Sequence, residues 1–353
     1  MRVDQLVPAY HRGDAIGDTA THLKEFFISQ GFQSQIYCLS RDQGLEEESS
    51  LFSAFPPPES SDITILHFAL PSPLTQAFIN LPSKKIIIYH NITPPEFFIG
   101  FDQELANVSH LGRQELKSLV PHVSLALADS DYNRQELLEL GFKRTEVFPL
   151  FIDFDKYKKP MNPLMYELIH GERLNILFVG RIAPNKKIED LIKVTFYYKK
   201  YISPLVRLIV VGKTSTVPKY YQSLIRLADD FFLQPEEICF TGHIPDEEMF
   251  ALYQAADVFL SLSEHEGFCL PLVESMIFGL PIIAYDCGAV PSTLGGAGIL
   301  VKEKRVDYLA ELVAEVVHNS SLRKKLIASQ RQRLSQFKRM DQGKFLRQTL
   351  NNL

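Results

Sequence analysis

Short β-rich runs alternate with helical segments along this chain, stop, and then begin again, and this double series constrains the fold most. The first runs lie at residues 3–7 and 35–39, on either side of a segment at 18–30 whose apolar residues recur at helical spacing. Further strands are predicted at 63–68, 85–89 and 124–128. Such alternation predicts parallel strands joined by crossover helices.

A proline-rich break separates the two series. The stretch FPLFIDFDKYKKPMNP after Val147 has three prolines and no regular periodicity, which indicates a connection between domains. The 353 residues also exceed what one hydrophobic core usually supports. The second series predicts strands at 175–179, 207–211, 238–241, 258–262, 282–285 and 299–301, with helices at 188–201, 218–232 and 245–255.

We therefore predict an α/β protein with two doubly wound, Rossmann-like domains, 1–158 and 159–338, that face a central cleft. The remaining segment, 339–353, is expected to form a helix that packs back on the first domain. Ligands of such sheets bind beyond the carboxyl ends of the strands, so functional residues should lie in loops that follow strands.

Composition excludes several classes of protein. Hydrophobic residues make up 46% and charged residues 22%, as in ordinary globular proteins. The net charge of −5 provides no general cationic field, so no nucleic-acid partner is expected. The four cysteines are widely scattered and indicate reduced thiols. No long apolar stretch occurs, which predicts a cytoplasmic protein that is at most peripheral to a membrane, through its first domain.

The strongest chemical signal is SEHEGFCLPLVE at residues 263–274, directly after a predicted strand. Gly267 and Pro271 place Glu266 in a loop and Glu274 within the following helix. A helix start offers unpaired amides and a positive dipole end to a diphosphate, and a carboxylate one turn later can accept ribose hydroxyls. The alternative is a solvated loop acid followed by an ordinary acid on a helix surface.

A second signal is GRIAPNKK at residues 180–187, also after a predicted strand. Arg181 and Lys186 lie five residues apart on a turn from strand to helix, where both can neutralise a phosphate. By itself this segment fits a solvated basic turn equally well.

Three further features carry less information. Gly13-Asp14-Ala15-Ile16-Gly17 allows close backbone approach to a ligand, but glycines also serve plain turns. His90 ends a predicted buried strand, where a lone histidine is more often structural. Asp129-Ser130-Asp131 and Asp153-Phe154-Asp155 have spacing that suits a divalent ion, yet Ser130 or Asp131 fits a helix N-cap better, so no metal site is expected.

In combination, these residues resemble glycosyltransferase family 4, retaining enzymes of the GT-B fold among the glycosyl transferases group 1. Three pieces carry the resemblance in order: Gly180-Arg181 with Lys186, the segment from Glu266 to Glu274 followed by GLPIIA at 279–284, and GGAGILV at 295–301. Two departures are the unpaired glycines of the 13–17 loop and Ser292, which stands where an acid often occurs.

The resemblance implies a role for each matched residue. Arg181 and Lys186 would bind the donor diphosphate and stabilise the leaving nucleotide, and Glu266 and His90 would contact the donor sugar. Glu274 would hold the ribose. The other implied donor-binding residues are Gly13, Asp14 and Gly17 in the first domain and Gly180, Gly212, His265, Gly267, Phe268, Cys269 and Leu270 in the second.

The implied activity is retaining hexosyl transfer without a metal or other cofactor, in which the donor phosphate takes the acceptor proton. The donor would be a GDP-sugar or a UDP-sugar, with a slight preference for GDP-mannose. The acceptor would be a glycan or a lipid-linked sugar in cell-surface polysaccharide assembly, bound by the first domain. The exact donor, the acceptor, the linkage and the oligomeric state stay open.

Two other classes compete with this interpretation. A nucleotide-dependent oxidoreductase predicts a GxGxxG turn with an acid about twenty residues later, which neither half contains. A non-catalytic glycosyltransferase-like subunit would share the fold. The joint presence of Arg181, Lys186, Glu266 and Glu274 favours the enzyme.

Overall fold

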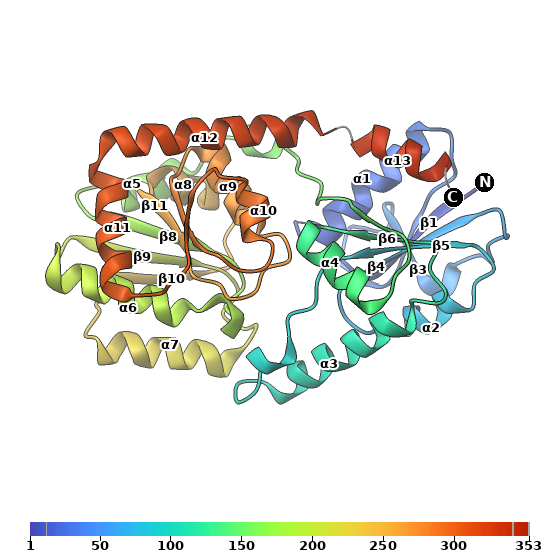
Figure 1. The fold of residues 1–353 in the computed structure, drawn as a ribbon, viewed down its shortest axis with the longest axis horizontal. Helices are drawn as coiled ribbons and strands as arrows, with labels where there is room; N and C mark the ends of the chain where they lie inside the picture. The colour runs from blue at the N-terminus through green and yellow to red at the C-terminus, as the bar shows by residue number, and fades with distance from the viewer. Residues whose placement is uncertain (12, 341, 352–353) are drawn as a thin grey trace. The chain divides into compact units, whose positions relative to one another are not determined.

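The computed structural model describes residues 1–11, 13–340 and 342–351, and these form two compact α/β units (Figure 1). The first unit contains Met1–Glu96, Glu104–Ile152 and the last helix, and the second contains Phe97–Gln103 and Asp153–Met340. The main connection between the units therefore falls within the predicted break.

The first unit is built on a seven-stranded sheet in the order β3-β2-β1-β4-β5-β6-β7, with every pairing parallel. The order reverses between β1 and β4. The strands are β1 (Val3–Tyr10), β2 (Ile36–Arg41), β3 (Ser49–Leu51), β4 (Ile63–Phe68), β5 (Lys84–Tyr89), β6 (Leu125–Ala128) and β7 (Thr145–Val147).

Helices cover both faces of this sheet, because β-strands buried on both sides present apolar residues to each face. Helices α1 (Ala15–Ser29) and α13 (Gln342–Asn351) share one apolar cluster with the strands, which includes Leu23, Phe27 and Leu346. The other cluster holds side chains from α2 (Pro73–Ile79), α3 (Gln103–Ser118) and α4 (Asp131–Leu140). The last helix thus packs within the first unit, where Phe345 also stacks on Phe148.

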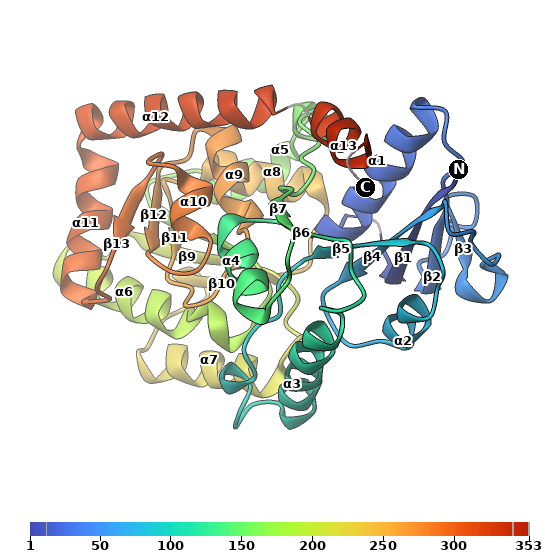
Figure 2. The same ribbon diagram turned by 45° about the vertical axis from the view of Figure 1, so that its right-hand side comes forward.

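The second unit has a six-stranded parallel sheet in the order β10-β9-β8-β11-β12-β13 (Figure 2). Its order reverses between β8 and β11. The strands are β8 (Leu174–Val179), β9 (Val206–Val211), β10 (Ile238–Gly242), β11 (Val258–Ser261), β12 (Ile282–Tyr285) and β13 (Ile299–Val301). The helices are α5 (Pro163–Ile169), α6 (Ile188–Tyr201), α7 (Pro218–Asp230), α8 (Asp246–Ala255), α9 (Leu270–Phe278), α10 (Val290–Leu294), α11 (Val306–His318) and α12 (Ser320–Arg339).

The prediction of two doubly wound α/β sheets is confirmed, and all eleven predicted strands are present. Their ends lie within two residues of the expected ones, except that β1 continues three residues further, to Tyr10. The edge strands β3 and β7 were not predicted, because three-residue strands carry too little periodicity to detect. Helix α5 was also not predicted. It begins inside the proline-rich break, where Asn162 accepts hydrogen bonds from two backbone amides and Pro163 occupies the first turn.

A short segment of the first half of the chain, Phe97–Gln103, belongs to the second unit. The Phe97 ring lies 6.2 Å from the His265 ring, and Phe101 meets Tyr220 edge-on at 5.3 Å. The break between the units is therefore not the only place where the chain passes from one unit to the other.

Candidate active site

The loops that follow β8 and β11 form the candidate site, because these adjacent strands mark the point where the sheet order reverses. Ligands of doubly wound sheets bind at that point, beyond the carboxyl ends of the strands. The loop after β8 carries Arg181 and Lys186, and the loop after β11 carries Glu266. The two strongest sequence signals therefore lie side by side in the second unit.

An ion pair joins the two loops at their centre. Lys186 Nζ lies 2.7 Å from Glu266 Oε1, and the two side chains are only 13% and 7% exposed. Since a buried carboxylate is costly without a partner, Lys186 stabilises Glu266 in this position. The pair places one cation and one anion together at a strand end, before any ligand arrives.

Backbone hydrogen bonds fix the register of the two loops. The Glu264 amide donates to the Asn185 carbonyl at 2.8 Å, and Asn185 Nδ2 donates to the His265 carbonyl at 3.0 Å. Asn185 is buried. Its supporting role was not predicted, although Asn185 stands inside the GRIAPNKK segment.

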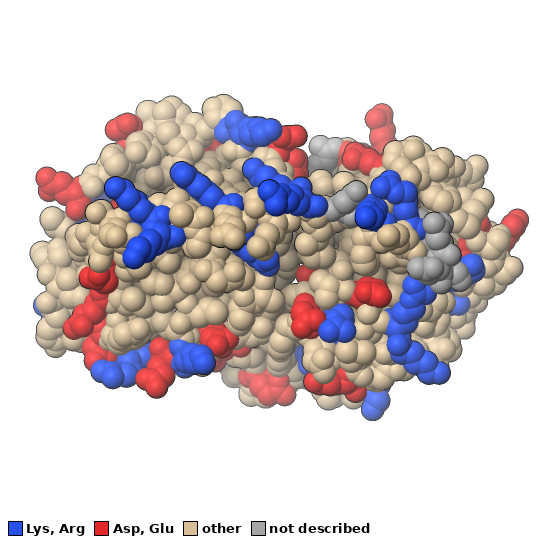
Figure 3. Space-filling view, turned by 45° about the horizontal axis from the view of Figure 1, so that its top comes forward, with Lys and Arg blue, Asp and Glu red and all other residues tan. Residues whose placement is uncertain are grey.

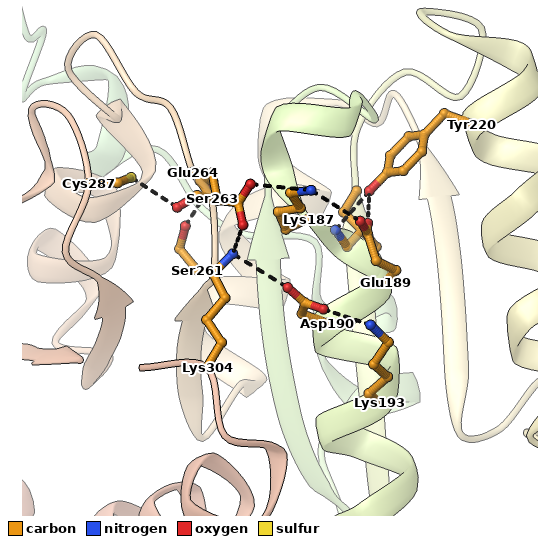
Figure 4. A network of polar contacts seen from close by, with 11 residues as sticks. Lys187, Glu189, Asp190, Lys193, Tyr220, Ser261, Ser263, Glu264, Cys287 and Lys304 are labelled. Atoms are coloured by element: carbon orange, nitrogen blue, oxygen red, sulfur yellow. Dashed lines mark hydrogen bonds and ion pairs between the residues drawn. The ribbon is translucent and has the colours of Figure 1, made fainter. Parts of the chain in front are cut away.

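A second layer of ion pairs surrounds the same turn (Figure 4). Glu264 lies 3.2 Å from Lys187 Nζ and 2.9 Å from Lys304 Nζ, and Lys304 also reaches Asp190 at 3.4 Å. Burial alone would raise the pKa of Glu264, but Lys304 and Lys187 together lower it. These contacts tie the β8 loop, the β11 loop and the segment after β13 into one rigid support.

Arg181 differs from Lys186 because its side chain is exposed. It stands at the ends of β8 and β9, where the Gly180 amide donates to the Val211 carbonyl at 2.9 Å. A Cβ atom on Gly212 would lie 1.9 Å from the Gly180 carbonyl oxygen, so only glycine fits there. Gly180 and Gly212 therefore let the two strand ends approach closely, and Arg181 is available for an anion.

The turn after β12 supports the Glu266 loop from the other side. The Ala289 amide donates to the Glu266 carbonyl at 3.0 Å, and Thr293 Oγ1 donates to the Phe268 carbonyl at 2.6 Å. A Cβ atom on Gly288 would lie 2.5 Å from the Glu266 carbonyl oxygen. These supporting residues were missed; the one available signal was a glycine soon after a predicted strand.

Helix α9 begins directly after this loop. Glu266 is in the loop and Glu274 is inside the helix, as predicted. Cys269 precedes the helix in the left-handed region, with φ of 67°, and its side chain makes no capping bond to the first turn. Burial raises the pKa of the Cys269 thiol well above its ordinary value, so the thiol remains protonated. The helix start therefore has no side-chain cap, although Pro271 carries no amide hydrogen and the Leu272 amide already donates to the Cys269 carbonyl at 3.1 Å.

Glu274 is buried and already bonded through both carboxylate oxygens. Tyr157 Oη donates to Oε1 at 2.9 Å and Tyr253 Oη donates to Oε2 at 2.7 Å. Burial raises the pKa of Glu274, and the two tyrosine hydroxyls oppose this increase. The ribose contact remains a prediction, and it requires Tyr157 to share or release its carboxylate oxygen.

His90 lies in the first unit, in a row of hydrogen-bonded side chains from four neighbouring strands. Its Nε2 is 2.9 Å from His67 Nδ1 and its Nδ1 is 3.0 Å from Asp129 Oδ2, and its side chain is only 2% exposed. His67 Nε2 in turn bonds Gln5 Oε1 at 2.9 Å. Because Gln5 uses its amide group to donate to Ala20, His67 donates from Nε2 and accepts at Nδ1.

Both ring nitrogens of His90 therefore already have partners, with Nε2 donating to His67. A ring contact with the donor sugar stays a prediction that requires one of these bonds to break. Burial lowers the pKa of His67 well below its ordinary value, so His67 is neutral. The row joins four neighbouring strands through their side chains, from Gln5 inside β1 to Asp129 directly after β6.

The glycine loop after β1 has clear structural roles. Asp14 caps α1 by accepting a hydrogen bond from the Gly17 amide at 2.6 Å. A Cβ atom on Gly17 would lie 1.9 Å from the His11 carbonyl oxygen, so the helix start abuts the end of β1. Gly13 has φ of 75° and no heavy atom near its missing Cβ. Its open space is compatible with the predicted ligand approach, which remains untested.

Neither candidate metal motif forms a cluster. Ser130 is the N-cap of α4, as predicted, and accepts from the Asn133 amide. Asp153 Oδ1 accepts from the amides of Asp155 and Lys156. Within residues 1–11, 13–340 and 342–351, no group of histidine, cysteine and acidic residues is arranged to hold a metal ion. In the same part of the chain, no helix is long and apolar enough to cross a bilayer.

Residues 167–333 match the family model for glycosyl transferases group 1. The matched segment contains Arg181, Lys186, Glu266 and Glu274.

The relatives that match part of this chain include several proteins named as mannosyltransferases. The O-antigen chain mannosyltransferase B of Escherichia coli is 27% identical over 182 residues, 50% of this chain and 44% of that protein. A GDP-mannose-dependent alpha-mannosyltransferase of Mycobacterium tuberculosis (strain CDC 1551 / Oshkosh) is 29% identical over 197 residues, 54% of this chain and 48% of that protein. The chain thus spans less than half of the length of these relatives.

Solved structures match over the whole chain. Anabaena Alr3699/HepE in complex with UDP has a TM-score of 0.75 at 17% identity and covers 100% of both chains. WaaG, described as a glycosyltransferase involved in lipopolysaccharide biosynthesis, has a TM-score of 0.71 at 14% identity and covers 99% of this chain and 98% of its own. Likeness at these identities establishes the fold, which is that of the GT-B glycosyltransferases.

Glu274→Gln should change how stability depends on pH. Because burial raises the folded-state pKa of this acid, the folded protein keeps the proton to higher pH than the unfolded chain does. The stability that Glu274 contributes is therefore complete below the ordinary carboxyl pKa and is lost as pH rises through the raised value. The melting temperature of the wild-type protein, relative to that of the variant, should therefore fall as the pH is raised from about 4 to about 8.

The exposed Glu247→Gln serves as the matched control, because it removes the same charge from the neighbouring helix α8. If the melting temperatures of the wild-type protein and Glu274→Gln changed with pH in the same way over this whole range, Glu274 would titrate as an ordinary acid.

Proposed function

We propose that this chain is a metal-independent, retaining glycosyltransferase of family 4, which transfers a hexose from a nucleotide diphosphate to a glycan or lipid-linked acceptor. The second unit would bind the donor and the first unit the acceptor, in the cytoplasm and in the service of cell-surface polysaccharide assembly. The observation that carries the proposal is the Lys186–Glu266 pair beside the exposed Arg181, at the switch point of the sheet and inside the family match.

The chemistry required is the neutralisation of a leaving diphosphate. As the bond from the anomeric carbon to the phosphate oxygen breaks, its electron pair passes to that oxygen. Arg181, Lys186 and the positive end of the α9 dipole, which no side chain caps, would oppose the developing charge. Since these groups are held in place beforehand, little reorganisation is needed during the reaction.

Retention requires the acceptor to enter on the face from which the nucleotide leaves. The acceptor hydroxyl oxygen forms the new bond to the anomeric carbon, and its proton passes to the oxygen of the departing phosphate. Glu266 holds Lys186 in position through the 2.7 Å ion pair, and its other oxygen would accept a hydrogen bond from a hydroxyl of the donor sugar. No ionisable side chain is required as a nucleophile in this scheme.

GDP-mannose is the favoured donor. The support is that relatives of this chain are named as mannosyltransferases, and one is named as GDP-mannose-dependent. The second candidate is a UDP-sugar, because the structurally similar HepE was solved with UDP and with UDP-glucose.

The deciding experiment is thermal stabilisation of the purified protein by a panel of nucleotide sugars. A ligand at about one hundred times its Kd adds about 2.7 kcal/mol to the free energy of unfolding. We expect a selective increase in melting temperature with GDP-mannose, unchanged by EDTA or Mg²⁺ and reduced in Glu274→Gln. A shift with UDP-glucose alone would transfer the assignment to a UDP-sugar.

The same panel tests the competing class. If no nucleotide sugar stabilises the protein at millimolar concentration, donor binding is absent and the chain is a non-catalytic glycosyltransferase-like subunit. A shift that requires Mg²⁺ would contradict the metal-independent mechanism but would leave the transferase assignment in place.

A further inference from the structure

Helix α12 (Ser320–Arg339) has a charge composition unlike the rest of the protein. It contains no acidic residue, whereas the whole chain has a net charge of −5. Mixed signs are usual on exposed helices, because like charges along one helix repel each other. Its basic residues are Arg323, Lys324, Lys325, Arg331, Arg333, Lys338 and Arg339.

Two of these cations have structural roles within the second unit. Arg323 donates to the Asp257 carbonyl at 2.7 Å, and Arg333 donates to the Thr293 and Ser292 carbonyls at 3.1 and 2.6 Å. They flank the buried side of the helix, which consists of Leu326, Gln330 and Leu334.

The other five cations are exposed and point away from the buried side. Lys324, Arg331 and Lys338 follow one another at intervals of seven residues and so form one stripe, with steps of about 10 Å along the axis. Lys325 and Arg339 flank this stripe. Figure 3 shows the result as a row of Lys and Arg side chains across the face that comes forward when the top of Figure 1 is turned toward the viewer.

None of these five cations forms an ion pair with an acidic residue in the described part of the chain. Lys338 lies over the Phe154 ring at 5.1 Å, which leaves its charge unneutralised. Some basic residues elsewhere in the same unit are paired, as Lys193 is with Asp190 and Lys199 is with Glu237. The stripe therefore presents only positive charge along a rigid helix about 30 Å long.

We propose that this stripe docks the second unit on the anionic headgroups of a membrane surface. A straight row of exposed lysines and arginines on a helix that is packed along its full length matches a planar array of phosphates. The phosphates of a nucleic acid follow a curved path, which a straight row of cations matches poorly. The net negative charge of the rest of the chain would also repel a nucleic acid. The expected membrane contact through the first domain is a separate hypothesis, and this proposal does not depend on the donor assignment.

The test measures binding of the full chain to vesicles of phosphatidylglycerol and phosphatidylethanolamine by co-sedimentation. The variant Lys324→Gln/Arg331→Gln/Lys338→Gln removes the stripe without touching the buried side. The control Lys200→Gln/Lys219→Gln/Lys302→Gln removes three exposed charges from other surfaces of the same unit. At roughly 5-fold per cation, the stripe variant should partition on the order of 100-fold more weakly, and the control should bind as wild type does.

Four results would support or overturn the proposal. Wild-type binding should disappear on vesicles of neutral phosphatidylcholine, and it should weaken steeply between about 0.1 M and about 0.5 M salt. Equal loss in the control and the stripe variant would show that only net charge matters and would overturn the site. Wild-type binding to a duplex DNA as strong as to anionic vesicles would overturn the membrane as the partner.

Discussion

Combining Arg181→Gln with Lys186→Gln should lower kcat/KM by more than a thousandfold, and each single change by about 10²- to 10³-fold. In the proposed mechanism both cations would stabilise the leaving diphosphate, whose charge grows as the glycosidic bond breaks. The two single variants should differ in thermal stability. Lys186→Gln removes the one ion pair that the buried Glu266 forms within the described residues, so it should lower the melting temperature. Arg181 is exposed and forms no ion pair in this part of the chain, so its loss should lower the melting temperature less.

Lys187→Gln is the matched control for this experiment. Lys187 is the next residue along the chain, and its ion pair with Glu264 is partly exposed, so it should contribute less than about 1 kcal/mol. We expect its kcat/KM to stay within a few-fold of the wild-type value. Full turnover by the Arg181→Gln/Lys186→Gln enzyme would exclude the proposed stabilisation of the leaving group.

Gly212→Ala should destabilise the second unit by roughly 3 kcal/mol or more, enough to lower its melting temperature by about 6–12 °C. The reason is steric: an added Cβ atom would lie 1.9 Å from the Gly180 carbonyl oxygen and 2.9 Å from its carbonyl carbon. Backbone atoms cannot rotate out of the way as a flexible side chain can. The ends of β8 and β9 would have to separate, and Arg181 would move with them.

Gly171→Ala is the control, because nothing lies within 4 Å of the added Cβ atom and its φ is not positive. We expect its melting temperature to match wild type or to rise slightly through a less flexible unfolded chain. Differential scanning calorimetry resolves both changes. If Gly212→Ala melted at the same temperature as the wild-type protein, the two strand ends could separate without a measurable loss of folding free energy.

Much of the site could be predicted from local sequence. The order of β-rich and helical segments determined two parallel sheets, since parallel strands need long crossover connections. It also determined which loops matter, because carboxyl ends of parallel strands meet at one edge. Arg181, Lys186 and Glu266 were placed correctly after β8 and β11 for this reason. Glu274 was placed inside α9 because Gly267 and Pro271 restrict where that helix can begin.

Hydrogen-bond partners far apart in the chain could not be predicted in this way. Tyr157 bonds Glu274 across 117 positions, and it comes from a segment whose sequence indicated only a connection. The sequence indicated that a lone histidine at His90 is more often structural, but it could not name His67 and Asp129 as the partners of its two ring nitrogens. Such pairings depend on the side chains that packing brings together, and no local pattern records them.

What the sequence by itself determined is therefore the class of fold, the chain order of the strands and the loops that carry charge. Local spacing is sufficient for this, because periodicity and turn residues act within a few positions. Only the tertiary structure decided that Lys186 pairs with Glu266, that Gly288 and Asn185 support that pair, and that the cations of α12 share one exposed side. These outcomes depend on burial, which is a property of the packed chain and forces each buried polar group to find a partner.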